Sequence, residues 1–212
     1  MEIAVCLTTA VVAYLLGSIP TGYLVGMAKG IDVRKAGSGN IGATNAFRIL
    51  GKGAGILVLL VDASKGSLAA ALVPKLVHGM INPTSEDTEY LQIIGGVMVI
   101  LGHNYTCWLK FKGGKGIATS AGVLIALIPW AFAVGFVAWM VVFFLTRYVS
   151  LASIAAAVSL PFATWASGSS YSMLVVATIL SVLAIYKHKP NIERLLNGTE
   201  NKLGRKKDPT IS

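Results

Sequence analysis

The segment GSGNIGATNAFR, at residues 37–48, is polar and rich in glycine, yet it separates two long apolar runs. The run before it covers residues 4–28, and the run after it covers residues 53–77. A stretch of about 20 apolar residues is long enough to cross a bilayer as a helix. The order of these three segments therefore predicts two membrane spans joined by a polar connection, whose composition needs its own explanation.

Further apolar runs follow along the chain, separated by short polar breaks. We predict seven spans, at residues 4–28, 53–77, 91–109, 114–129, 131–147, 150–167 and 171–187. The composition agrees, because 55% of the 212 residues are hydrophobic and 13% are charged, with a mean hydropathy of +0.71, whereas a soluble domain needs a more charged surface. The first run continues past Val25 with no basic residue before it, which argues against a cleaved signal peptide. The predicted fold is an all-α polytopic membrane protein, a single domain over residues 1–212.

Basic and non-basic connections alternate along these predicted spans. The basic ones are 29–52, 110–115, the link at Arg147 and the amphipathic tail 188–212 with Lys187 before it; segment 78–90 is acidic, and the two remaining links are neutral. Basic connections stay in the cytoplasm, so the pattern predicts an outside N-terminus, a cytoplasmic C-terminus and glycine-rich segments at the cytoplasmic face. The net charge of +9 then reflects topology and anionic lipid or ligands, and we expect no nucleic-acid partner.

Cysteine and metal chemistry are not indicated. Cys6 lies in the first predicted span and Cys107 near the end of the third, and the chain has no recognisable metal-ligand spacing. We therefore expect no disulfide, no metal ion and no cofactor.

Segment 37–48 has the composition of an anion-binding loop. Its glycines allow close backbone approach and positive φ, and the N–H groups of such a loop, or of a helix that starts nearby, bind anions. Neutral donors and one guanidinium, which suits phosphate or carboxylate, accompany them. The candidate residues are Gly37, Ser38, Gly39, Asn40, Gly42, Thr44, Asn45 and Arg48. Taken alone, the segment also fits a flexible polar turn without a ligand.

A second segment, GHNYTCWLKFKGGKGIATSAG at residues 102–122, places lysines around two glycines just before an apolar run. It lacks the Walker spacing and a preceding strand, so a nucleotide-hydrolysing loop is not predicted. We expect a phosphate cradle formed by Lys112, Gly113, Gly114, Lys115 and Gly116, whereas Lys110 serves to fix topology.

His103, near the inner end of the third span, allows two interpretations. A histidine there can donate to an oxyanion or act as acid or base, or it can bond a neighbouring helix. We therefore include His103 among the candidate binding residues, with the structural role equally open.

A third segment, HKPNIERLLNGTE at residues 188–200, directly follows the last predicted span. Pro190 is suited to the first turn of a short helix, and the isoleucine and leucines give that helix an apolar face. An amphipathic helix on the bilayer accounts for these apolar residues. It does not account for the choice of His188 and Asn191, which lie at the start of that helix, close to the membrane surface.

Two other polar features have structural interpretations. Asp62 and Lys65 are three residues apart in the second span, and we predict that they pair on one helix face. Pro20, between Gly17 and Gly22, is expected to bend or loosen the first span.

The three polar segments resemble, in the same order, the signature regions of the bacterial acyl-phosphate:glycerol-3-phosphate acyltransferases, the PlsY family. GSIPTGYL at 17–24 and DASKG at 62–66 add to a resemblance that covers nearly the whole chain. The chain departs from the pattern at Thr106, where proline is expected, and at Lys189, where arginine is frequent. Residues 82–89 resemble a lengthened outer loop.

The resemblance implies a multi-pass enzyme of the bacterial cytoplasmic (inner) membrane with a cytoplasmic-side active site. It would transfer a fatty acyl group from acyl phosphate to the 1-hydroxyl of sn-glycerol 3-phosphate, giving lysophosphatidic acid and phosphate, the first step of phospholipid synthesis. Its partners would be these substrates and membrane lipid, and it would act as a monomer. The acyl-CoA acyltransferase signature, an Asp five residues after a His, is absent at His103 and His188.

The resemblance also suggests roles for the candidate residues. Arg48, Lys112 and Lys115 would neutralise phosphate charge and orient two mutually repelling anions. The nucleophile is the substrate hydroxyl, so we expect direct transfer rather than acylation of Ser38, which has no committed base. The base is either His188 or a substrate phosphate, and His188 and Asn191 mainly hold substrate. Ser38, Lys115, His188 and Asn191 are the predicted catalytic residues.

Two other functions are consistent with parts of the pattern. Cationic sites at helix breaks also suit a small transporter or channel for phosphorylated solutes. We disfavour it because the charged motifs share one predicted side and no inverted repeat is recognisable. A purely structural membrane protein would not need three polar motifs on one surface.

Overall fold

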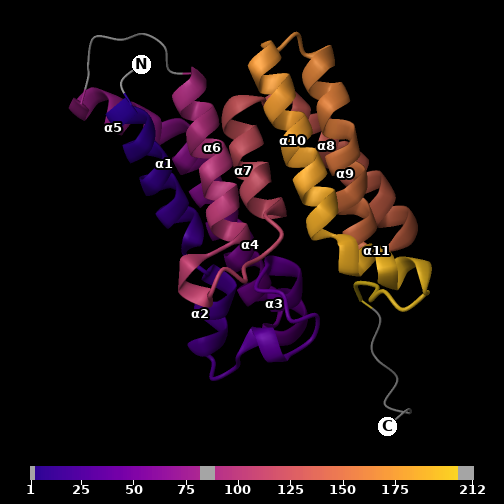
Figure 1. Cartoon of the computed structure of the whole chain (residues 1–212). Coiled ribbons are helices and arrows are strands. Elements are labelled where there is room, and N and C mark those ends of the chain that lie inside the picture. Colours follow the sequence, from indigo (N-terminus) through magenta and orange to yellow (C-terminus); the bar gives the residue numbers. More distant parts are fainter. Residues whose placement is uncertain (1–2, 82–88, 205–212) are drawn as a thin grey trace, which may run out of the picture. The chain divides into compact units, whose positions relative to one another are not determined.

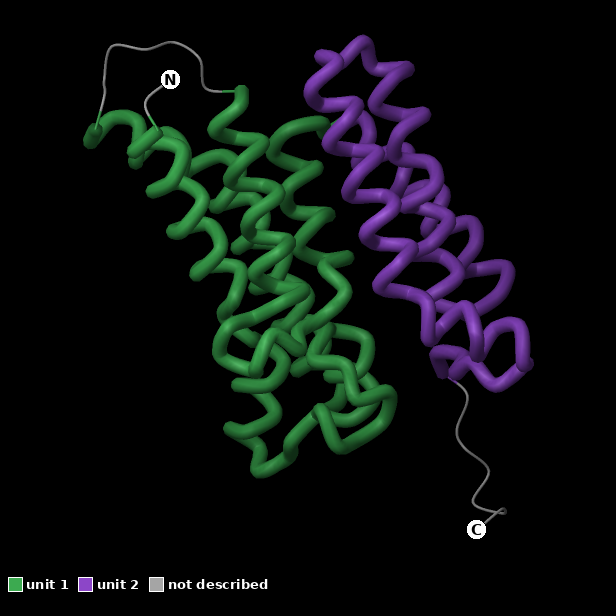
Figure 2. The backbone as a smooth tube through the Cα atoms, viewed as in Figure 1, with its two compact units in different colours: residues 1–129 green, residues 130–212 purple. Residues whose placement is uncertain are grey.

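The computed structural model describes residues 3–81 and 89–204, and it confirms the all-helical prediction for that part of the chain, which contains no strand. The chain divides into two compact units, residues 1–129 and residues 130–212, which are described separately (Figure 2). The predicted outer loop at 82–89 lies outside the described residues except for Glu89, as does the end of the tail from residue 205.

Unit 1 contains the first four predicted spans and the first two polar segments (Figure 1). Its helices are α1 (Ile3–Ser18), α2 (Thr21–Met27), η1 (Val33–Lys35), α3 (Ala43–Leu50), α4 (Lys52–Ser67), η2 (Leu68–Leu72), α5 (Val73–Ile81), α6 (Glu89–Asn104), η3 (Cys107–Leu109) and α7 (Ile117–Leu127). Unit 2 contains α8 (Pro129–Thr146), α9 (Val149–Ala166), α10 (Tyr171–Lys187) and α11 (Lys189–Leu196).

Several helical runs are long and apolar enough to cross a membrane. In the described residues there are four, Ile3–Met27, Lys52–Ile81, Pro129–Thr146 and Val149–Ala166, and a fifth if the pair α10 and α11, bent by 54°, counts as one. The predicted break in the first run is confirmed: α1 ends at Ser18 and α2 begins at Thr21, with Pro20 between them. The second run continues through the π-helical η2 to Ile81, four residues beyond the predicted edge at 77.

The third and fourth predicted spans are shorter than expected. The prediction 91–109 is wrong at its end, because α6 stops at Asn104 and the chain turns through η3, with Lys110 and Phe111 at positive φ. The prediction 114–129 is wrong at its start, because residues 112–116 form a loop and α7 covers only Ile117–Leu127. The end of α6 and the start of α7 therefore both adjoin the second polar segment, whose residues form a turn and a loop instead of helix.

Small residues let the helices of unit 1 pack closely. A β-carbon at Gly17 of α1 would overlap with the carbonyl of Val99 in α6, and one at Gly102 of α6 would overlap with the carbonyl of Tyr14 in α1. The same reciprocal contact joins α4 and α7 at Gly66 and Gly122. Lipid offers no hydrophobic force between apolar helices, so close van der Waals packing of this kind contributes much of their association.

In unit 2, α9 and α10 pack against each other, and α11 follows α10 after the bend. The Ser181 hydroxyl of α10 donates to the Ala157 carbonyl of α9 at 2.6 Å. The predicted short helix after the last span is confirmed as α11, with Pro190 in its first turn, where a missing N–H costs nothing.

We predict that Gly122→Ala destabilises the protein by about 1–3 kcal/mol, because the added methyl group would collide with the backbone of α4 at Ala63. Gly53→Ala is the matched control, since a β-carbon added at Gly53 would meet none of the described atoms within 4 Å. The control should keep or slightly raise the thermal unfolding temperature in detergent. Equal unfolding temperatures for Gly122→Ala and the wild type would contradict the close α4–α7 contact.

Candidate active site

The first polar segment is held in shape by one buried side chain, that of Asn45 on α3. Its Nδ2 donates to the carbonyl oxygens of Val33 at 3.0 Å, Ala36 at 3.1 Å and Asn40 at 2.9 Å. Its Oδ1 accepts from the N–H of Ser38 at 2.9 Å. The whole amide is thus engaged with the backbone of residues 33–40, which favours a loop-holding role for Asn45 over direct ligand contact.

The glycines of this segment serve the same loop. Gly37 and Gly39 have φ angles of 62° and 70°, as predicted, and a β-carbon at Gly37 would collide with the Asn45 amide oxygen. Gly42 instead has a φ of −79° and caps the N-terminus of α3, while its N–H is bonded to Asn40 Oδ1 at 2.8 Å. The first N–H groups of α3 have no carbonyl one turn before them, so this end of the helix suits an anion.

The remaining candidates of the first segment are placed around this helix start. Ser38 is exposed on the loop, and Thr44 and Arg48 are half-buried on α3. Thr44 and Arg48 are four residues apart and share one face of α3. The structure therefore brings a hydroxyl, a guanidinium and helix N–H groups onto one short element.

An ion pair fixes the entrance to this loop. Asp32 accepts from the Arg34 guanidinium at 2.7 Å, and the Arg34 guanidinium lies over the Tyr23 ring, 4.5 Å from its centroid. The hydrogen bonds and charge of Arg34 lower the pKa of Asp32 to about 2. Arg34 is thus engaged with its own loop, and Arg48 on α3 stays the arginine of the predicted phosphate site.

The second segment wraps around the end of α6. The N–H of Gly113 donates to the carbonyl of Asn104 at 3.2 Å, and the N–H of Gly114 donates to the carbonyl of His103 at 2.9 Å. Gly114 lies directly against the His103 ring, since a β-carbon there would overlap with Nε2. Only a glycine fits this contact.

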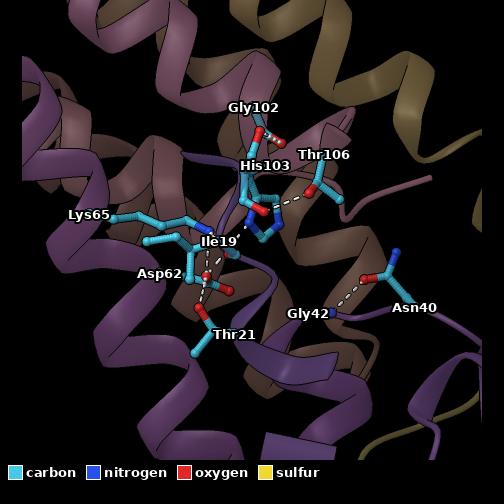
Figure 3. A network of polar contacts seen from close by, with 10 residues as sticks. Ile19, Thr21, Asn40, Gly42, Asp62, Lys65, Gly102, His103 and Thr106 are labelled. Carbon is cyan, nitrogen blue, oxygen red and sulfur yellow. Dashed lines mark hydrogen bonds and ion pairs between the residues drawn. The ribbon is translucent and has the colours of Figure 1, made fainter. Parts of the chain in front are cut away.

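A buried polar cluster, which we call the Asp62 cluster (Thr21, Asp62, Lys65 and His103), lies on the other side of His103 (Figure 3). Asp62 Oδ1 is 2.8 Å from Lys65 Nζ, and it accepts from Thr21 Oγ1 at 2.9 Å. The same oxygen is 3.6 Å from His103 Nδ1. The predicted Asp62–Lys65 pair is confirmed, but the pattern did not indicate its contacts with α2 and α6.

Side chains from this region donate hydrogen bonds to backbone carbonyls at the break between α1 and α2. Lys65 Nζ donates to the carbonyl of Ile19 at 2.9 Å, and Thr106 Oγ1 donates to the carbonyl of Ser18 at 2.5 Å. A proline at position 106 could not make the second bond. The departure at Thr106 therefore supplies a donor to a backbone carbonyl that the helix break leaves without its usual partner.

Unit 2 carries the third segment. His188 is buried at the junction of α10 and α11, and its Nδ1 lies 2.7 Å from the carbonyl of Ala184, so Nδ1 carries the proton in the neutral ring. Asn191 Nδ2 donates to Glu200 at 2.7 Å, and Glu200 also accepts from Arg194 Nε at 2.6 Å and Ser150 Oγ at 2.9 Å. The prediction did not include Glu200, although it is the last residue of the quoted motif.

The predicted site residues are therefore distributed over two units. Unit 1 holds Gly37, Ser38, Gly39, Asn40, Gly42, Thr44, Asn45, Arg48, His103, Lys112, Gly113, Gly114, Lys115 and Gly116, and unit 2 holds His188 and Asn191. Within unit 1, residues 37–48 form one loop-and-helix element and residues 103–116 form a second. Their binding roles stay predictions.

We predict that Glu200→Gln destabilises the fold at neutral pH by about 1–3 kcal/mol, because three donors lose a charged acceptor. Burial raises the pKa of Glu200, but hydrogen bonds from Asn191, Arg194 and Ser150 outweigh it and hold that pKa below 4.5. A lowered folded-state pKa stabilises the fold above the unfolded value and loses this effect as pH falls through the folded one. The stability difference from wild type should therefore shrink as the pH falls below 4.5 in detergent unfolding curves; a pH-independent difference would contradict it.

Comparison with known proteins places these features in a family. The sequence model of the family described as glycerol-3-phosphate acyltransferase matches residues 7–198. A glycerol-3-phosphate acyltransferase of Desulforamulus reducens is 44% identical over 92% of this chain and 94% of its own length. One from Bacillus subtilis is 43% identical over 91% of this chain and 95% of its own length.

A solved structure is also similar. The crystal structure of PlsY (YgiH), an integral membrane glycerol 3-phosphate acyltransferase, in its glycerol 3-phosphate form, superposes with a TM-score of 0.83 at 39% identity, covering 94% of this chain and 96% of the other. Its lysophosphatidic acid form superposes with a TM-score of 0.81. The chain therefore belongs to the glycerol-3-phosphate acyltransferase family of multi-pass membrane proteins.

Proposed function

We propose that this protein transfers a fatty acyl group to the 1-hydroxyl of sn-glycerol 3-phosphate, giving lysophosphatidic acid. Membership of the family supports the reaction, and the similar PlsY structures are those of its glycerol 3-phosphate and lysophosphatidic acid forms. The observation that carries the proposal is the pairing of glycine-built loops with cations, at residues 37–48 and 112–116. The same matches count against the transporter interpretation.

We propose acyl phosphate as the donor. The hydroxyl oxygen of glycerol 3-phosphate attacks the carbonyl carbon, the bond from that carbon to the phosphate oxygen breaks, and phosphate leaves with the electron pair. The hydroxyl proton passes to a base. Because acyl phosphate is an activated donor, the reaction needs mainly charge neutralisation and positioning, which cationic loops supply.

The residues of unit 1 suit the handling of phosphate. Arg48 and the N–H groups at the start of α3 can neutralise and orient one phosphate. Lys112 and Lys115 flank glycines whose backbone is fixed against α6. Ser38, exposed on its loop, is assigned as a donor to substrate rather than a nucleophile. Backbone N–H groups are the candidates for stabilising the oxyanion.

The base in our mechanism is a substrate phosphate, whose second pKa of about 6 suits the task. His188 and Asn191 instead hold substrate, and Glu200 orients Asn191 through their hydrogen bond. His188 is anchored through Nδ1 to Ala184, which aims Nε2 in a fixed direction. A His188 ring held in this way suits both substrate binding and proton transfer. A substitution at His188 is therefore needed to separate the two roles.

The membrane arrangement completes the proposal. We propose seven spans in a bacterial cytoplasmic membrane, with the N-terminus outside and both glycine-built loops facing the cytoplasm, since connections rich in lysine and arginine stay inside. We further propose that residues 1–212 function as one acyltransferase domain and as a monomer, without a cofactor.

The direct test is phosphate release by detergent-purified protein given palmitoyl phosphate, with and without glycerol 3-phosphate. We expect release that depends on glycerol 3-phosphate, yields lysophosphatidic acid and falls at least about 100-fold in Arg48→Ala, because one charged contact to substrate is lost. Lys52→Ala, which removes an exposed charge nearby, is the control and should stay near wild type. No turnover by folded protein would contradict the function, and turnover with palmitoyl-CoA alone would overturn the donor.

His188→Gln tests the choice of base. If a substrate phosphate takes the proton, the variant should raise the KM for glycerol 3-phosphate about tenfold or more while kcat at saturation stays within about threefold of wild type. A fall in kcat of about 100-fold or more at saturating substrate, with KM unchanged, would instead make His188 the base.

A further inference from the structure

The Asp62 cluster lies in the part of unit 1 that connects the membrane helices to the glycine loop at 112–116. Asp62 on α4 and Thr21 on α2 are both almost fully buried, as is His103 on α6. Their contacts converge on a single carboxylate oxygen, Oδ1, which Lys65 also contacts. A carboxylate at such depth, with polar contacts from α2, α4 and α6, fixes the helices that bear those groups.

His103 has contacts on both sides of its ring. Its Nδ1 is 3.6 Å from Asp62 and has no hydrogen-bond partner among the described residues, while its Nε2 edge lies against Gly114. Its carbonyl accepts the Gly114 N–H, and the next carbonyl, that of Asn104, accepts the Gly113 N–H. The same residue thus touches the buried carboxylate and sets the path of the loop.

From this geometry we infer that Asp62 is a positioning residue for substrate phosphate. Held by Thr21 and Lys65, it orients the His103 ring, which supports the backbone of Gly113 and Gly114 and so places Lys112 and Lys115. The inference rests on the proposed function, because it assigns those lysines to a substrate phosphate. It gives His103 a supporting role and no part in proton transfer.

Two other roles for these residues predict different behaviour. If His103 were an acid or base, every side chain without an imidazole would abolish turnover. If Asp62 and Lys65 only stabilised the packing of the helices, loss of the carboxylate would lower the amount of folded enzyme. KM would stay unchanged, because the molecules that remain folded would bind substrate normally.

Two amides at position 103 separate these roles. The amide nitrogen of His103→Asn lies near the place of Nδ1 and keeps a polar group beside Asp62, whereas that of His103→Gln lies near Nε2, against Gly114. We expect His103→Asn to lower kcat/KM by about threefold or less, and His103→Gln to lower it by about 30-fold or more, since small displacements of binding groups have large effects. Losses of about 100-fold in both variants, with unchanged KM, would overturn the inference.

Asp62→Asn tests the carboxylate itself. We expect the KM for at least one of the two phosphorylated substrates to rise about 30-fold while kcat stays within about threefold. Amides of the peptide covering 105–116 should exchange faster in hydrogen–deuterium exchange without substrate, because Gly113 and Gly114 lose their fixed acceptors. Ser67→Ala, which removes a partly buried hydrogen bond from the same helix to Gly122, is the control and should change neither readout.

The outcomes distinguish the inference from the proposed function. Wild-type protein that fails to form lysophosphatidic acid defeats the proposed function, whatever the variants do. Active wild-type protein, together with unchanged KM and unchanged exchange at 105–116 in Asp62→Asn, defeats the inference alone.

Discussion

The interaction on which unit 1 most depends is the set of contacts to the Asp62 carboxylate. Among membrane helices there is little water to satisfy a charge, so a carboxylate there must find its donors within the protein. Asp62 finds them on its own helix and on α2, and the His103 ring of α6 lies 3.6 Å from the same oxygen. Because these polar groups come from α2, α4 and α6, sliding one helix past another would leave the buried Asp62 carboxylate without its contacts.

The same shortage of water explains the surroundings of this cluster. The break between α1 and α2 exposes carbonyls of Ser18 and Ile19, and donors from Thr106 and Lys65 meet them. Side chains from α4 and from the turn after α6 thus offset the cost of the break. Irregular backbone at such a level is tolerated where protein groups replace water.

Sequence patterns predicted much of this fold, for physical reasons that differ between elements. Long apolar runs specify membrane helices because the bilayer leaves few other choices, and an i,i+3 spacing is enough to pair Asp62 with Lys65. Composition marked the glycine loops as candidate anion sites, and that role stays a prediction. The contact between Asp62 and His103 was not predictable from the sequence, because it joins residues 41 positions apart (103 − 62) and depends on how α4 packs against α6. Asn45 was assigned to ligand because its amide is a neutral donor in a glycine-rich segment, whereas in the structure that amide bonds to the backbone of its own loop.

If loops held by buried polar groups carry a phosphate site, that site should bind substrate before any chemistry takes place. The most direct test is equilibrium binding of radiolabelled glycerol 3-phosphate to detergent-purified protein, without any acyl donor, for wild type and Arg48→Ala. We predict saturable binding by the wild type that inorganic phosphate displaces and that the variant weakens about tenfold or more, since hydrogen bonds to charged groups are worth that much. Equal binding by the two proteins, or no saturable binding by folded wild type, would contradict the account.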